Sequence, residues 1–286
     1  KSKRHEASDF GFEPVWMPNG AFDFQEHIIN KAVRKGRVGI FADTGLGKTL
    51  QQLAIAENVI RVTNKRVLIL TPLAVAFQFI EEATRIGIDD IEHSKDGKFS
   101  KKIVVCNYER LHLLNSDDFE CVILDESSIL KNFAGKTRDL IVAFIKKVPY
   151  RFLATATPSP NDFIELGNSS EALGYMGYMD MLGKFFKSNQ GSVDSDNRNI
   201  GEKFYLKPHA ERDFFAWVNQ WSIMVKKPSD LGYSDAGYGL PALHTNNHVV
   251  HNSKQWSIGG QMSLYAMQAK TMTGVREEQK LTVTER

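Results

Sequence analysis

The chain has 286 residues, of which 42% are hydrophobic and 24% charged, and its formal net charge is +2. That composition is ordinary for a folded protein with a full core, and it excludes a polycation that binds nucleic acid through bulk charge. No apolar run approaches the roughly 20 residues of a membrane span, so we expect no membrane partner. The first residue is not Met, so we expect a fragment of a longer protein.

Short apolar runs without polar alternation recur up to about residue 170, which is typical of strands buried on both faces of a parallel sheet. The runs are Val38–Phe41, Val67–Leu70, Ile103–Cys106, Cys121–Leu124 and Phe152–Ala154. Helical patterns at 24–35, 76–83 and 140–145 alternate with these runs. The alternation predicts a doubly wound α/β domain over 21–170, with its ligands at the carboxyl ends of the strands.

The rest of the chain has a different character. Residues 1–20 are predicted to be irregular. Residues 171–230 are interpreted as an insertion followed by a Trp-rich helix that runs through Val225 and packs on the sheet domain. Residues 231–286 are interpreted as a linker, extended at first and then helical. We therefore expect a mixed helical and irregular C-terminal extension.

Residue types that ligate metals are sparse. Cys106 and Cys121 have no cysteine or histidine at ligand spacing, so we expect buried thiols in a reducing compartment. His244, His248 and His251 have a spacing that could hold zinc, but no cysteine or acid lies close enough to complete a site. An ordinary extended segment is the favoured interpretation of those histidines.

A glycine loop, Asp43-Thr44-Gly45-Leu46-Gly47-Lys48-Thr49, follows the first apolar run and precedes a helical pattern. Glycines let backbone N–H groups approach an anion, and the start of a helix directs further N–H groups toward it. Lys48 would reach the outer phosphates of a nucleotide, and the Thr49 hydroxyl would ligate Mg²⁺. A plain glycine turn is the alternative, but the flanking strand and helix favour a phosphate-binding loop.

Three further patterns lie at strand ends or before the loop. Asp125 and Glu126 follow an apolar run, which suits a magnesium carboxylate and a general base, although a solvated turn is the alternative. The sequence Thr155-Ala156-Thr157-Pro158 ends the last run, and alone it would be a plain turn. The Gln25 amide can donate and accept, which suits the edge of adenine, although a helix-surface position is its usual place.

In this order, the motifs resemble those of the N-terminal RecA-like motor lobe of superfamily-two helicases and translocases. Within that superfamily they most resemble the Swi/Snf-like branch. The matching stretches are Phe24-Gln25, 43–49 (motif I), 70–75 (motif Ia), 105–111, Asp125-Glu126-Ser127-Ser128 (motif II) and 155–158 (motif III). The segment 226–232 is similar to phage and prophage helicases.

The resemblance implies an ATP-dependent DNA translocase or helicase in the cytoplasm of a bacterial or phage-infected cell, with ATP and Mg²⁺ as cofactors. It implies Lys48, Asp125 and Glu126 as catalytic residues, and Thr49 and Asp125 as holders of Mg²⁺. The implied nucleotide-binding residues are Phe24, Gln25, Thr44, Gly45, Leu46, Gly47, Lys48 and Thr49. The implied nucleic-acid contacts are Thr71, Pro72, Tyr108, Lys131 and Asn132, and Thr155 and Thr157 would couple the motifs. The implied partners are double-stranded DNA, held without sequence preference, and a second RecA-like lobe.

Two departures keep an alternative open. Ser127 and Ser128 stand where motif II usually has Ala-His or Ala-Asp, which we expect to alter the link from motif II to motif III. No arginine-bearing motif of a second lobe follows residue 170. The alternative is therefore a non-catalytic ATPase-like lobe that binds DNA or a protein. An unrelated phosphate-loop kinase or GTPase is disfavoured, because motif III and Gln25 would have no role in it.

Overall fold

The computed structural model describes residues 9–131, 136–159, 162–188 and 204–238, together with two short strands further along the chain. The chain divides into two units, Lys1–Tyr238 and Gly239–Arg286. In the second unit the described residues are the antiparallel strands β10 (Ser257–Ile258) and β11 (Gln261–Met262). The three histidines, the helix expected in the tail and Asn132 lie outside the described residues.

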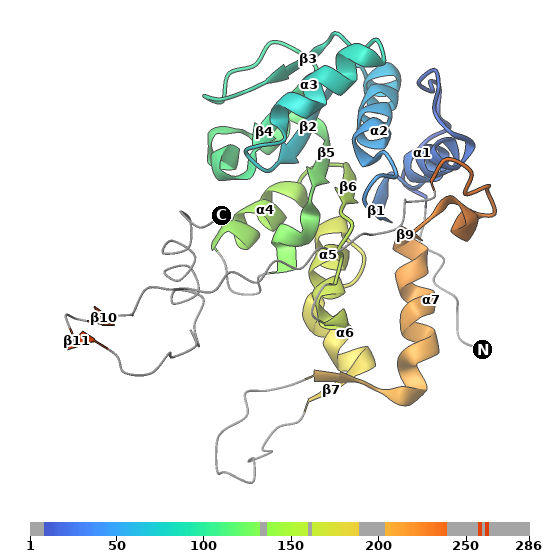
Figure 1. The fold of residues 1–286 in the computed structure, drawn as a ribbon, viewed down its shortest axis with the longest axis vertical. Helices are drawn as coiled ribbons and strands as arrows, with labels where there is room; N and C mark the ends of the chain where they lie inside the picture. The colour runs from blue at the N-terminus through green and yellow to red at the C-terminus, as the bar shows by residue number, and fades with distance from the viewer. Residues whose placement is uncertain are drawn as a thin grey trace. The chain divides into compact units, whose positions relative to one another are not determined.

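A seven-stranded parallel sheet is the centre of the first unit, in the order β3-β4-β2-β5-β6-β1-β9 (Figure 1). Its strands are β1 (Arg37–Ala42), β2 (Arg66–Thr71), β3 (Ile91–His93), β4 (Ile103–Asn107), β5 (Phe119–Asp125), β6 (Tyr150–Ala154) and β9 (Ser222–Val225). Five of them coincide with the apolar runs, and their central residues are buried. The predicted parallel, doubly wound sheet is confirmed.

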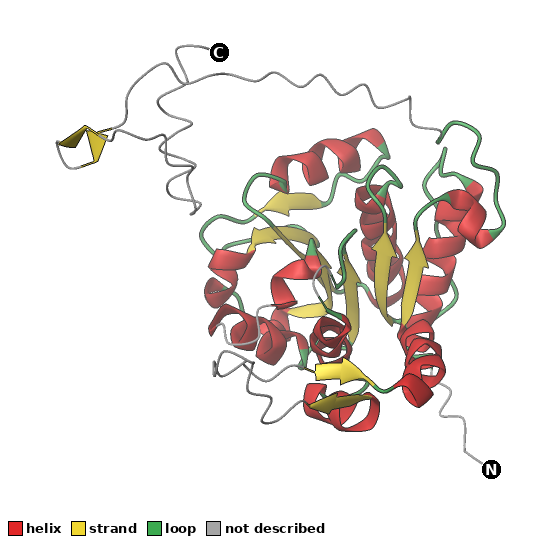
Figure 2. Cartoon of the chain, turned by 60° about the horizontal axis from the view of Figure 1, so that its bottom comes forward, coloured by secondary structure: helices red, strands yellow, loops and turns green. Residues whose placement is uncertain are grey.

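Helices cover both faces of this sheet, as Figure 2 shows. One face carries α1 (Asp23–Lys35), α2 (Lys48–Thr63) and α3 (Ala76–Arg85), whose apolar side chains share one core cluster. The core on the other face includes residues of α4 (Lys136–Ile145), α5 (Leu166–Leu173), α6 (Tyr178–Phe185) and α7 (Glu211–Trp221). The short strands β7 (Phe186–Ser188) and β8 (Phe204–Leu206) form a separate antiparallel pair. None of the described helices is long and apolar enough to cross a membrane.

The C-terminal edge of the sheet corrects the sequence prediction. The Trp-rich helix was expected to continue to Val225, but α7 ends at Trp221 and the next four residues form β9 beside β1. Ile223 and Val225 are buried on one face of the sheet while Met224 is 41% exposed, which is the alternation of a strand. Trp221 is fully buried on the other face, against Phe41. Beyond residue 170 the chain therefore completes the sheet of the α/β domain.

Asn58 on α2 holds the irregular N-terminal segment against the domain. The Asn58 side chain is fully buried, and its Oδ1 accepts hydrogen bonds from the backbone N–H groups of Val15 (2.8 Å) and Trp16 (3.0 Å). Its Nδ2 donates to the carbonyls of Trp16 and Ala54, both at 2.8 Å. Each polar atom of this amide is thus paired, as burial demands.

The substitution Asn58→Ala should lower the free energy of unfolding by about 2–3 kcal/mol, because it leaves backbone groups without partners. We expect a lower urea midpoint and faster proteolysis within residues 9–20. Asn30→Ala on α1 is the control, since Asn30 is partly exposed and should change stability by less than about 0.5 kcal/mol. Equal stability of the two variants would contradict the role given to Asn58.

Candidate functional site

The glycine loop lies between the carboxyl end of β1 and the first residue of α2, Lys48. Gly45 and Gly47 have φ values of +85° and +76°, the left-handed region that glycine adopts without strain. A Cβ on Gly47 would also lie 2.3 Å from Nε2 of Gln25. The turn therefore favours glycine at 47, because another residue would strain the backbone and displace Gln25. It places the first N–H groups of α2 at the end of the sheet, which is a position that suits an anion.

The Lys48 ammonium folds back onto its own loop. Its Nζ donates to the carbonyl oxygens of Ala42 (2.9 Å) and Asp43 (3.1 Å). Burial lowers the pKa of Lys48, and the charges of Glu126, Asp125 and Asp43 oppose that shift. The lysine and the two acids of motif II therefore lie close enough to interact electrostatically, at one edge of the sheet.

Asp125 ends β5 and is tied to two neighbouring elements. Its Oδ1 accepts a hydrogen bond from Nε2 of Gln52 on α2 (2.8 Å), and its Oδ2 accepts one from Oγ1 of Thr71 at the end of β2 (3.2 Å). Burial is the largest effect on Asp125 and raises the pKa of its carboxyl group, while these two hydrogen bonds lower it. The carboxylate is thus oriented before any ligand arrives.

Glu126 turns out of the strand with a φ of +52°, a left-handed conformation that is uncommon for a residue other than glycine. Its Oε1 accepts hydrogen bonds from Oγ1 of Thr155 (2.9 Å) and from Oγ of Ser128 (3.1 Å). The backbone N–H of Thr157 donates to Oγ1 of Thr155 at 3.1 Å. Thr155 of motif III therefore contacts the second acid of motif II, and Thr157 contacts Thr155.

Gln25 is 5% exposed, so the helix-surface alternative does not describe it. Its Oε1 accepts from the backbone N–H of Phe22 (3.1 Å), and its Nε2 donates to the carbonyl of Leu46 (3.1 Å). Gln51 Nε2 donates to the same carbonyl at 2.9 Å. Phe24 is buried in the core. In this structure Gln25 joins the start of α1 to the glycine loop, and its contact with adenine stays a prediction.

The structure revises the predicted nucleic-acid contacts. Thr71 is fully buried with its hydroxyl on Asp125, and Tyr108 is 3% exposed with its hydroxyl 2.6 Å from the Asp125 carbonyl. Neither side chain reaches the surface, so a contact with a phosphate backbone would use the main chain at these two positions, and it stays a prediction. Pro72 is partly exposed. The side chain of Lys131 and the whole of Asn132 lie outside the described residues, so their contacts stay predictions.

Sequence reasoning missed Gln52, which reaches the metal carboxylate from α2. The available signal was its spacing, because a residue four positions after Lys48 lies one turn further along the same helix face. Both Gln51 and Gln52 are fully buried, and Oε1 of each has no hydrogen-bond partner among the described residues. These two acceptors are free for a further donor such as water.

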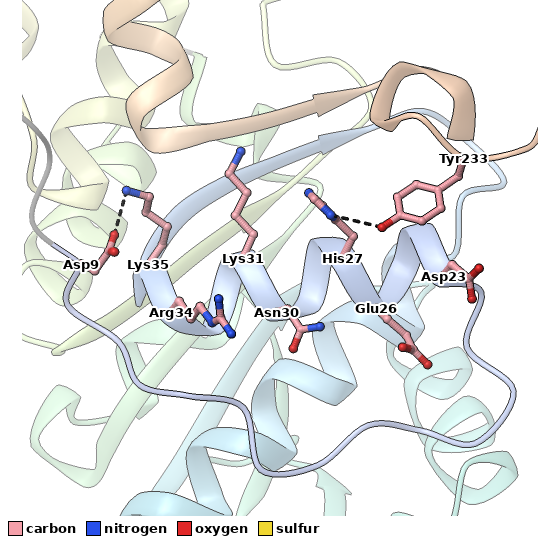
Figure 3. Close-up of a pocket in the computed structure, with 9 residues that line it drawn as sticks. All are labelled: Asp9, Asp23, Glu26, His27, Asn30, Lys31, Arg34, Lys35 and Tyr233. Atoms are coloured by element: carbon pink, nitrogen blue, oxygen red, sulfur yellow. Dashed lines mark hydrogen bonds and ion pairs between the residues drawn. The ribbon is translucent and has the colours of Figure 1, made fainter.

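A surface hollow of about 320 Å³ is lined by Asp43 of motif I and by Ala156 and Pro158 of motif III, among others. Two further surface hollows lie near these elements. One, of about 410 Å³, is lined by Thr49 of α2 and by Gln78, Glu81, Glu82 and Arg85 of α3. The other, of about 620 Å³, follows the outer side of α1 (Figure 3). In the hollow along α1, Lys35 pairs with Asp9 at 2.8 Å, and the hydroxyl of Tyr233 lies 3.3 Å from Nδ1 of His27. It contains none of the residues of motifs I, II or III.

The donor set fits a magnesium ion that arrives with a nucleotide. Asp125 and the Thr49 hydroxyl supply oxygen atoms, which Mg²⁺ prefers. Each carboxylate oxygen of Asp125 accepts one hydrogen bond from the described residues, so it keeps a lone pair for a further donor or a metal-bound water. The described residues contain no group of three or more His, Cys, Asp or Glu side chains that could hold an ion alone.

A phosphate-type loop after β1, an acidic pair after β5 and hydroxyl residues after β6 meet at the carboxyl edge of one parallel sheet. That combination defines a RecA-like nucleotide-binding lobe. The DEAD/DEAH box helicase family model matches residues 22–165, half of the chain, and the chain belongs to this family.

Relatives and solved structures agree with the Swi/Snf-like branch. An uncharacterized ATP-dependent helicase YqhH of Bacillus subtilis is 28% identical over 64% of this chain and 35% of its own length. A SWI/SNF-related regulator of chromatin, subfamily A-like protein 1, of Xenopus tropicalis is 29% identical over 50% of this chain and 16% of its own length. The SWI2/SNF2 ATPase core of Sulfolobus solfataricus in complex with dsDNA has the same fold, with a TM-score of 0.56 and 18% identity. That match covers 74% of this chain and 46% of the core. The chain thus spans about a third of the bacterial relative and less than half of the solved core.

The substitution Asp125→Asn should raise the melting temperature of the ligand-free chain at pH 7 by about 1–3 °C, because burial makes the ionised carboxylate costly. A carboxyl whose pKa is raised in the folded state costs stability as the pH rises through that pKa. The gain should therefore shrink as the pH falls from 7 to 4, in thermal denaturation followed by circular dichroism. Asp89→Asn is the control, because Asp89 is exposed and its ionised carboxylate carries no burial cost. A lower melting temperature for Asp125→Asn at every pH would contradict this account.

Proposed function

We propose that the chain is the first motor lobe of an ATP-driven translocase or helicase that moves on double-stranded DNA. Helicase-like ATPase function follows from the family. The observation that carries the finer proposal is the meeting of Lys48, Asp125 and Glu126 at one sheet edge, with Thr155 joined to Glu126. The origin in a bacterial or phage-infected cytoplasm belongs to the same proposal.

Each group has a separate part in hydrolysis. The loop amides and Lys48 would bind the phosphates, and Lys48 would exchange its two loop carbonyls for phosphate oxygens. Thr49 and Asp125 would hold Mg²⁺, which supplies positive charge to the outer phosphates. Glu126 has one oxygen engaged by two hydroxyls, and its other oxygen would accept the proton of the attacking water.

A second RecA-like lobe would complete the cleft and supply cationic side chains to the transferring phosphate. Support comes from the relatives, which are about three to six times as long as the part they share with this chain. DNA as the substrate is supported by the dsDNA complex of a protein with the same fold. Binding would be salt-dependent and blind to sequence, because phosphate contacts position a protein without reading bases.

The substitution Lys48→Ala should reduce DNA-stimulated ATP hydrolysis by the whole natural protein about 100-fold or more, because it removes the charge on the outer phosphates. Phosphate release at saturating duplex DNA and Mg²⁺ measures this. Lys65→Ala is the control, since Lys65 is an exposed residue paired with Glu120. Hydrolysis that survives Lys48→Ala would end the motor proposal, whereas the absence of DNA-stimulated hydrolysis by the wild-type protein would favour a non-catalytic binding lobe.

The 286-residue chain alone should bind ATP with Mg²⁺ weakly and turn it over at less than about 1% of the rate of the whole protein, because one wall of the cleft is missing. Titration with a fluorescent ATP analogue and a phosphate-release assay measure the two properties. Brisk DNA-stimulated turnover by residues 1–286 would contradict the need for a second lobe.

A further inference from the structure

Motif II of this chain carries serine at its last two positions, and the structure gives those serines different environments. Ser128 donates its hydroxyl to Oε1 of Glu126 at 3.1 Å. Ser127 is 2% exposed, and its hydroxyl has no hydrogen-bond partner among the described residues. Of the two serines in motif II, only Ser128 therefore supplies a hydrogen-bond donor to Glu126, the proposed general base.

We propose that Ser128 is a positioning residue for Glu126. Its hydroxyl and that of Thr155 together fix Oε1, so that Oε2 is presented to the attacking water. The inference rests on the ATP hydrolysis proposed above, and it concerns the orientation of the base. Ser128 itself touches neither the nucleotide nor the water in this proposal.

The direction of each hydrogen bond follows from the groups involved. The N–H of Thr157 can only donate, so the Thr155 oxygen is its acceptor and the Thr155 hydroxyl proton remains for Glu126. An ionised carboxylate can only accept, so the Ser128 hydroxyl must donate to it. Both protons therefore point at one oxygen of Glu126, and bonds to a charged acceptor are the stronger kind.

The backbone explains why a residue two positions later can reach back to the acid. Glu126 has a φ of +52°, which turns the chain sharply out of β5. The next residues, Ser127–Lys131, form a short 3-10 helix. The turn lets the side chain of Ser128 meet that of Glu126.

Two donors on one carboxylate oxygen restrict a flexible side chain. A glutamate has three rotatable side-chain bonds, and each bond left free reduces the fraction of time that the base is correctly oriented. Thr155 alone supplies one contact and leaves the carboxylate able to rotate about it. With Ser128 present, Oε1 is held from β6 and from its own turn, and the link between motifs II and III runs through Glu126.

The experiment uses the whole natural protein with saturating duplex DNA and compares Ser128→Ala, Ser128→Thr and Ser127→Ala. Ser128→Ala should lower kcat for ATP hydrolysis about tenfold, because one hydrogen bond to a charged group is lost. The KM for ATP, the affinity for a non-hydrolysable ATP analogue and the affinity for DNA should change less than about twofold. Ser128→Thr should keep most of the wild-type kcat, because threonine supplies the same hydroxyl.

Ser127→Ala is the matched control, since it removes the adjacent hydroxyl, which has no hydrogen-bond partner in the part of the chain that the structure describes. It should leave kcat within about twofold of wild type. Melting temperatures of all three variants establish that they are folded, and the threonine variant separates loss of the hydroxyl from damage to the turn.

Ser128→Ala with wild-type kcat would overturn the inference, and so would equal losses for the alanine variants at 127 and 128. A loss expressed only in KM, or one that Ser128→Thr does not rescue, would overturn it as well. Lys48→Ala is measured in parallel. If hydrolysis depends on Lys48 and Ser128→Ala has no effect, this inference alone fails. If hydrolysis does not depend on Lys48, the proposed function fails with it.

Discussion

Asp125 joins parts of the chain that are far apart in sequence. Its carboxylate accepts one hydrogen bond from Gln52 of α2 and one from Thr71 of β2, and its backbone carbonyl accepts one from Tyr108 after β4. These contacts are available because β2, β4 and β5 run parallel, so their carboxyl ends meet at one edge. The same arrangement brings the loop after β1 and the threonines after β6 to that edge.

The central strands were predictable because their apolar runs are uninterrupted, and only a strand buried on both faces requires such a run. The edge strands, β3 and β9, were not predictable from the sequence. β3 has three residues, too few for a period to show. In β9, Val225 lies four positions after Trp221, which fits a helix face as well as a strand. Whether this segment forms a helix or a strand depends on the edge of β1 being open for pairing. That is a tertiary feature, which the local sequence does not reveal.

In the candidate site, too, some residues were predictable from the local sequence and others were not. The glycine loop and the acid pair are contiguous, so local spacing predicted them together with the strand ends that carry them. The position of Gln52, and the burial of Thr71 and Tyr108, depend on which way a side chain turns at the end of its strand or helix. Motif resemblance placed Thr71 and Tyr108 at a nucleic-acid surface, whereas packing directs both inward to support Asp125.

The protein compensates the charges of Lys48 and Asp125 at this edge only in part. Burial lowers the pKa of Lys48 and raises that of Asp125, so both groups are held in an environment that disfavours their charged forms. Their mutual attraction offsets part of that cost, and loop carbonyls and hydroxyl donors offset more. A nucleotide with Mg²⁺ would bring an anion for the lysine and a cation for the aspartate in one event. In the proposed function, the burial that disfavours these two charges would therefore favour a ligand that compensates both.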